Sequence, residues 1–152
     1  MKINYEITSN FNKYEFITKP KILLNICDKI EYGVTDTNVF YNRFYNKIEK
    51  DFSNNISTHK YGGISMCKIF TYHIICDMFC VCWPKSVYNI KPFKPLIFKE
   101  CCLKLCNYMK LNNIQDILSP IFGTEILEGN WKEILTILND IFPEDTHYTI
   151  FK

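Results

Sequence analysis

The chain has 152 residues, of which 47% are hydrophobic, 22% are charged and 16% are aromatic, and its formal net charge is +2 at pH 7. This length predicts one domain, residues 1–152, with a core large enough to fold without stabilising disulfide bonds or a structural metal ion. The composition excludes a disordered chain, and the mixed charges give nucleic-acid binding no electrostatic support. The sequence has no long apolar run and no signal-peptide core, which predicts an intracellular protein, cytoplasmic or nuclear, with no membrane partner.

Two strands and a helix are predicted in the first third. Residues 2–8 alternate in polarity, and residues 21–27, KILLNIC, form a nearly continuous apolar run of the kind found in buried parallel strands. The helix is indicated by apolar residues at helical spacing, which are Val39, Phe40, Phe44, Ile48 and Phe52. Asp36 or Thr37 is the expected cap of this helix.

The second half continues the alternation of strands and helices. Residues 64–70 and 73–83 predict the strands of a hairpin, and a helix is expected to start near Pro95 and run to about Lys110. Residues 112–121 predict the next strand. Strands alternating with helices indicate an α/β fold with a largely parallel sheet.

The last helix is predicted over residues 130–142. Asn130 is its expected cap, with Glu133 at capping-box spacing and Pro143 as its stop. Its apolar stripe is expected to comprise Trp131, Ile134, Leu135, Leu138, Ile141 and Phe142. Residues 146–152 are predicted to close the chain as a strand.

The eight cysteines allow two interpretations: they bind zinc, or they pack in the core as small apolar side chains. No CxxC pair occurs, and none of the three histidines has ligand spacing, which argues against zinc. Cys76, Cys80 and Cys82 share the parity of one strand face, and Cys102 and Cys106 are four apart on a helix. We therefore expect buried, reduced thiols, no metal and no cofactor. The chain has no alanine and one arginine, which suggests an AT-rich genome.

Three loops follow predicted strands and lead toward helices, namely residues 27–37, 82–92 and 119–130. Ligands of open α/β sheets bind at such carboxyl ends, and glycine before a helix suits a phosphate. Gly33 and Gly123 are single glycines, not a GxGxxG or Walker pattern, so spacing alone leaves phosphate binding and ordinary turns both open.

From Lys85 onward the chain resembles the macrodomain family, in particular its branch of small terminal ADP-ribose protein glycohydrolases. That branch shows a lysine, then "KP" with an aromatic residue, then "P-x-I-G-C-G-L-D" and a Trp that opens the next helix. Here Pro120, Gly123 and Trp131 fall on this spacing. The N-terminal third matches less closely, with residues 33–44 at the family's first glycine-rich loop. The resemblance implies a three-layer αβα sandwich with a mixed, largely parallel central sheet.

The resemblance also implies a ligand, ADP-ribose or a related nucleotide, and thus an ADP-ribosylated protein as partner of a monomer. The positions that match the family's ligand-binding loops are Ser9, Cys27, Gly33, Thr35, Pro120, Gly123 and Thr124. In this branch a lysine attacks the distal ribose, and Lys85 falls on that lysine. An attacking lysine must be a free amine, which requires a site that lowers its pKa.

Several positions depart from the family's pattern. The "GD" of the family is Thr8–Ser9 here, and Thr35 stands for the second glycine of the first loop. The "GCGLD" stretch reads Gly123–Leu127, so that Glu125 replaces a glycine and Leu127 replaces the catalytic aspartate. Leucine cannot transfer a proton, which leaves Glu128 and Glu125 as the candidate acids. Two functions remain open: a nucleotide-binding macrodomain with weak ADP-ribosyl-ester hydrolase activity, or a catalytically inactive interaction module derived from one.

Overall fold

A computed structural model describes residues 2–6, 19–27, 47, 50–70, 72–80, 94–120 and 131–151. The described strands are β1 (Lys2–Glu6), β2 (Lys21–Cys27), β3 (Ile64–Phe70), β4 (His73–Phe79), β5 (Asp116–Pro120) and β6 (His147–Phe151). The described helices are α2 (Pro95–Leu111), α3 (Trp131–Ile141) and a short 3-10 turn, Ile56–Thr58. Residues 50–54 are also helical.

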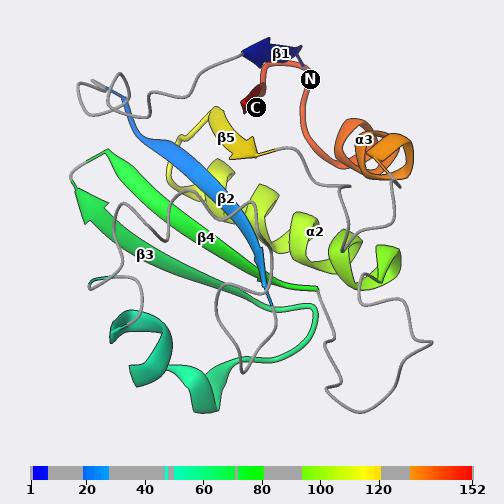
Figure 1. The fold of residues 1–152 in the computed structure, drawn as a ribbon. Helices are drawn as coiled ribbons and strands as arrows, with labels where there is room; N and C mark the ends of the chain where they lie inside the picture. Colours follow the sequence, from blue (N-terminus) through cyan, green and yellow to red (C-terminus); the bar gives the residue numbers. More distant parts are fainter. Residues whose placement is uncertain are drawn as a thin grey trace.

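The six described strands form one sheet in the order β1-β6-β5-β2-β4-β3 (Figure 1). The pairs β1–β6, β5–β6, β2–β5 and β2–β4 are parallel, and only β3 runs antiparallel, to its hairpin partner β4. The mixed, largely parallel sheet predicted from the sequence is therefore confirmed. Because β1 pairs with β6, the first and last strands of the chain lie side by side.

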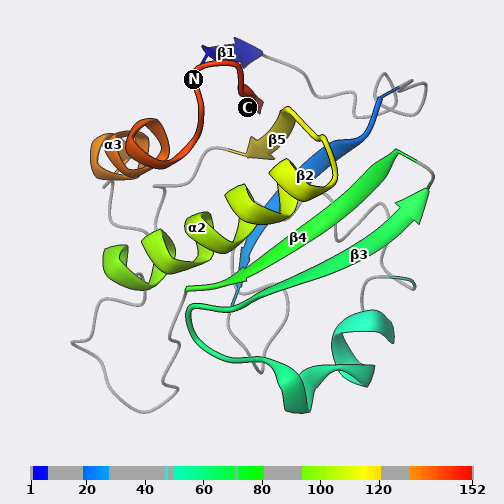
Figure 2. The same cartoon turned by 180° about the vertical axis from the view of Figure 1, so that it is seen from behind.

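Helices α2 and α3 cover one face of the sheet, as Figure 2 shows from the other side. The core between them takes alternate residues of the central strands, such as Ile22, Leu24 and Ile26 of β2, all buried. From α2 it takes residues at helical spacing, which are Phe98, Cys101, Cys102, Leu105, Cys106 and Met109. Ile134, Leu138 and Phe142, four residues apart, contribute from α3 and its end.

The opposite face of the sheet packs against the helical segment 50–54. Phe52 of this segment forms a small apolar cluster with Cys27 at the end of β2 and Phe79 at the end of β4. His59 stacks on Phe79, with ring centroids 4.3 Å apart, and lies 4.6 Å from Phe52. Helical segments thus lie on both faces, which confirms the αβα sandwich.

A glycine turn attaches the hairpin to α2. Gly62 has φ of +83°, a conformation that L side chains rarely adopt, and its carbonyl accepts a hydrogen bond of 2.7 Å from Lys104 Nζ. The neighbouring Gly63 carbonyl accepts a hydrogen bond from the Cys101 thiol at 3.3 Å. In the described part of the chain, no helix is long and apolar enough to cross a membrane.

Candidate functional site

The sheet brings the three predicted ligand loops to one edge. Strands β5, β2 and β4 are neighbours and run parallel, so the loops that follow Cys27, Cys80 and Pro120 all leave from their carboxyl ends. Cys27 and Phe79 are register partners, which places the first two departures side by side. We define this edge, the carboxyl ends of β5, β2 and β4, as the carboxyl edge. It is the position at which open α/β sheets bind ligands.

Strands β2 and β5 pair over only part of their length. The register covers Lys21↔Asp116 to Leu23↔Leu118, whereas β2 continues to Cys27 and β5 to Pro120. On its other side β2 pairs with β4 along its whole length. The ladder between β5 and β2 therefore ends before the carboxyl edge, where the first and third loops depart.

Both helices that follow these strands begin at the carboxyl edge. The amide of Lys94, which precedes α2, donates a hydrogen bond of 3.3 Å to the carbonyl of Cys80, which follows β4. The segment 81–93 therefore starts and ends at adjoining points of the structure. Pro95 occupies the first turn of α2, where its missing N–H costs no helical hydrogen bond. The partial positive charges at the amino ends of α2 and α3 therefore lie at this edge.

Two of the predicted binding residues belong to the described structure. Cys27 is the last residue of β2 and is fully buried against Phe52 and Phe79, so any contact with a ligand would involve its backbone. Pro120 is the last residue of β5, opposite Phe151. The remaining candidates lie outside the described residues and stay predictions. These candidates are Ser9, Gly33, Thr35, Lys85, Gly123, Thr124, Glu125 and Glu128.

A buried polar pair in the two central strands was not anticipated from the sequence. Asn25 Nδ2 of β2 donates a hydrogen bond of 3.0 Å to Asp77 Oδ1 of β4, and each residue is only 2% exposed. They are register partners two residues before the carboxyl edge, on the face opposite α2. The available signal was one polar residue inside each of two otherwise apolar strands. The pair fixes β2 and β4 beside each other where two of the loops depart.

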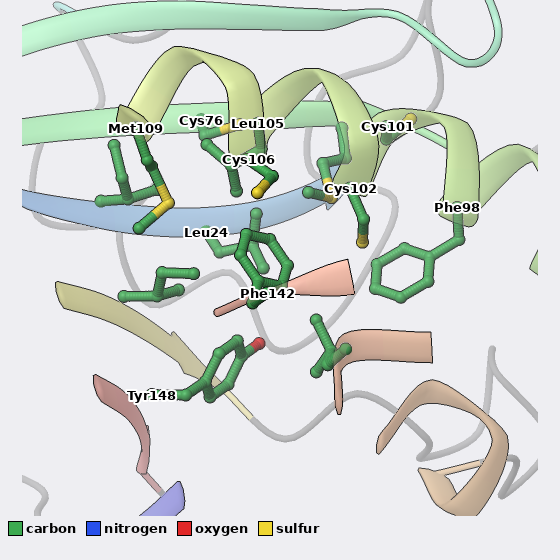
Figure 3. Close-up of a cluster of buried hydrophobic side chains, with 14 of the residues drawn as sticks. Leu24, Cys76, Phe98, Cys101, Cys102, Leu105, Cys106, Met109, Phe142 and Tyr148 are labelled. Carbon is green, nitrogen blue, oxygen red and sulfur yellow. The ribbon is translucent and has the colours of Figure 1, made fainter. Parts of the chain in front are cut away.

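A second polar pair lies on the α2 face, next to the end of β5. Ser119 and Tyr148 are fully buried, and burial raises the pKa of the Tyr148 phenol, an effect that the nearby Ser119 hydroxyl partly opposes. Tyr148 therefore stays neutral at physiological pH. Its ring fills the core below α2, beside Phe142 (Figure 3).

The cysteines of the described residues are buried free thiols, as expected. Cys76, Cys101, Cys102 and Cys106 line the space between α2 and the sheet (Figure 3). Burial raises the pKa of the Cys76, Cys80 and Cys102 thiols well above the ordinary value, so these groups are not thiolate nucleophiles. No group of three His, Cys, Asp or Glu side chains suited to a metal occurs among the described residues.

Comparisons with known proteins identify the fold. No family model matches the sequence, and no curated protein matches it either. A structure of a protein of unknown function from Bacteroides thetaiotaomicron aligns with a TM-score of 0.82 and 13% identity, over 99% of this chain and 98% of that one. A macrodomain protein from Streptomyces coelicolor aligns with a TM-score of 0.76 and 11% identity, over 99% of each chain.

A third similar structure is a complex with a ligand. DarTG from Thermosipho africanus, in complex with ADP-ribose, aligns with a TM-score of 0.61 and 8% identity, over 89% of this chain and 39% of that one. At such identities the alignments establish architecture only. The chain has the macrodomain fold, and the resemblance read from its sequence motifs is confirmed at this level.

Proposed function

We propose that this protein binds ADP-ribose, or a closely related nucleotide, at the carboxyl edge. The observation that carries the proposal is that three loops depart from the adjoining carboxyl ends of β5, β2 and β4 within a macrodomain fold. These are the loops that contain Gly33, Lys85 and Gly123. The bound group would be free ADP-ribose or the ADP-ribose of a modified protein.

Local electrostatics support an anionic ligand at this edge. The amino ends of α2 and α3 direct backbone N–H groups and the positive ends of their dipoles toward it. The first turn of α2 contains no acidic residue. A diphosphate held by backbone amides does not require the catalytic side chain that Leu127 replaces. Thermosipho africanus DarTG, of which 39% aligns with this chain, is in complex with ADP-ribose, and this supports the choice of ligand.

Hydrolysis of ester-linked ADP-ribose is expected to be slow or absent. Lys85 is the candidate nucleophile, and Glu128 and Glu125 are the candidate acids, because Leu127 stands at the aspartate position of the related branch. Loss of a positioned acid or base costs roughly 10²–10⁴ in rate. Glu125 also puts a negative charge at the position of a loop glycine, which opposes diphosphate binding.

The second candidate function is a catalytically inactive interaction module. The specific observation in its favour is the pair of replacements in the third loop, Glu125 for glycine and Leu127 for aspartate. Such a module would keep the fold and recognise a protein partner without turning over a nucleotide.

Thermal unfolding with a nucleotide panel tests the binding proposal. A ligand at about 100 times its Kd adds about 2.7 kcal/mol of stability. For a domain of this size that corresponds to a rise in Tm of roughly 5–11 °C. ADP-ribose should give this rise, and ribose 5-phosphate should give none. The same Tm with and without saturating ADP-ribose would leave the interaction module as the better account.

A variant series separates binding from catalysis. Leu127→Asp should gain cleavage of ester-linked ADP-ribose, and adding Lys85→Ala should abolish that gain. Lys99→Ala is the matched control, because Lys99 is exposed on α2. Rapid cleavage by the unmodified protein that survives Lys85→Ala would show that the assignment of these residues is wrong.

A further inference from the structure

A cavity lies far from the carboxyl edge, where α2 and α3 both end. It has a volume of about 200 Å³ and is bounded by the end of α2, the turn into β5 and the turn between α3 and β6. Since β5 and β6 begin there, it lies at the amino edge of the sheet. Figure 2 shows the end of α2 leading into β5 at this position.

The floor of this cavity is apolar and held in place by the core. Cys106 and Met109 of α2 contribute to it, together with Ile114 and Phe142, and each is at most 6% exposed. The Ile114 amide donates a hydrogen bond of 2.9 Å to the Met109 carbonyl. This bond follows Asn113, whose φ of 54° turns the chain back toward the sheet. The floor is therefore preformed, as small-molecule sites usually are.

The rim carries one side chain of each charge. Lys110 lies on one wall and Asp145 on another, and Lys110 forms no ion pair with any carboxylate of the described residues. Asp145 is held in place because Gln115 Nε2 donates a hydrogen bond of 2.9 Å to its Oδ2. The carboxyl ends of α2 and α3 add partial negative charge, which favours an ammonium group on the Asp145 side.

We propose that this cavity binds a free α-amino acid with a medium-sized apolar side chain, of the size of leucine or methionine. The ligand's ammonium group pairs with Asp145, its carboxylate pairs with Lys110, and its side chain covers the apolar floor. The volume is below the roughly 300–1,000 Å³ of sites for drug-sized ligands, which limits the occupant to about one amino acid. The inference is independent of ADP-ribose binding, since the two sites lie at opposite edges of the sheet.

The test is an NMR titration of the whole protein with four small molecules. Leucine contains all three groups, isopentylamine lacks the carboxylate, 4-methylpentanoate lacks the ammonium group, and glycine lacks the apolar tail. Leucine should bind with a Kd on the order of 1 mM and shift amides of residues 106–115 and 142–146. Each of the other three should bind at least about tenfold more weakly, because a hydrogen bond to a charged group or the burial of the side chain is lost.

Two charge-removing variants sharpen the test. Lys110→Met and Asp145→Asn should each weaken leucine binding about tenfold, and Asp145→Asn keeps an oxygen for the Gln115 hydrogen bond. Lys99→Met and Asp140→Asn are the matched controls on α2 and α3, and both should bind leucine as the unmodified protein does. All four positions are exposed, so the variants should keep the amide spectrum of the fold.

Several results would overturn the proposal. They are no shift with leucine, equal binding of isopentylamine or 4-methylpentanoate, equal binding of glycine, or shifts confined to the carboxyl edge. Leucine binding that is unchanged in both Lys110→Met and Asp145→Asn would also reject it, because the charged rim would then have no part in recognition.

Discussion

Removing one member of the Asn25–Asp77 pair should destabilise the protein more than removing both. The two side chains are 2% exposed and joined by a 3.0 Å hydrogen bond between the central strands. Asn25→Leu removes the amide donor from a buried carboxyl oxygen, which costs about 1.5–3 kcal/mol. Asp77→Leu leaves the Asn25 amide without this acceptor and should cost about the same.

The double variant Asn25→Leu/Asp77→Leu places two apolar side chains where two polar groups were buried. Its loss of stability should be smaller than the sum of the single losses, with a coupling free energy of about 1–3 kcal/mol. Asp77→Asn, which keeps an oxygen acceptor, should cost less than Asp77→Leu.

The free energy of unfolding should be measured by urea titration followed by circular dichroism, with Tm as a second reading. At roughly 2–4 °C per kcal/mol for a domain of this size, each single leucine variant should lose about 3–12 °C. Single losses below about 0.5 kcal/mol, or strictly additive losses in the double variant, would refute the claim that this hydrogen bond joins β2 and β4.

Three further predictions concern the core and the glycine turn. Burial raises the pKa values of the core thiols and favours their protonated form in the fold, so their contribution to stability should be constant below the ordinary thiol pKa of about 8.5. Above that pH it should fall by up to about 1.4 kcal/mol per pH unit for each thiol, and the contribution of Cys67 should level off at its pKa of about 11. Urea titration from pH 6 to 11 should show this fall in the free energy of unfolding, and a flat profile would contradict it. Gly62→Ala should cost about 1–2 kcal/mol through its positive φ, and Glu100→Ala, which removes the carboxylate that the new methyl group meets, should not restore the loss. Leu138 of α3 is fully buried, so Leu138→Ala should lower the free energy of unfolding by about 2–5 kcal/mol. Leu96 of α2 is 78% exposed, so Leu96→Ala should lower it by less than about 0.5 kcal/mol. Equal losses in thermal unfolding would show that α3 does not pack on the core.

Local patterns predicted the elements well where apolar runs are long. The run KILLNIC predicted β2 with its observed bounds, Lys21–Cys27, and the helix expected over residues 95–110 is α2, Pro95–Leu111. The second hairpin strand was expected to reach residue 83, whereas β4 ends at Phe79. There the Cys80 carbonyl bonds to the amide of Lys94 instead of a strand, a contact between distant residues that no local pattern encodes.

Some side-chain positions also escaped the sequence pattern. Leu135 was expected to pack against the sheet with its neighbours, but it is only half-buried. The buried line of α3 follows Ile134, Leu138 and Phe142 at intervals of four, and Leu135 lies about 100° around the helix from Ile134. The Asn25–Asp77 pair required the register of β2 against β4, which is set by tertiary packing and not by either strand alone.

The strand ends from which the three loops depart were predictable from the sequence, whereas the site residues in those loops remain predictions. The topology confirms that the loops after Cys27, Cys80 and Pro120 leave from one edge, as the strand order of the fold requires. Loop position indicated Gly33 and Gly123, and the family resemblance supplied Lys85; all three lie outside the described residues and remain predictions. Geometry at those positions depends on loop conformation, which glycine spacing alone does not fix.

The most direct test of ligand binding at the carboxyl edge is an amide NMR titration of the protein with ADP-ribose. Saturable shifts should concentrate at Cys27, Cys80 and Ser119, next to the three loops, while Asp116 and His147 at the opposite edge stay unchanged. Absence of any shift at millimolar ADP-ribose, or shifts centred on Asp116 and His147, would contradict the proposed function.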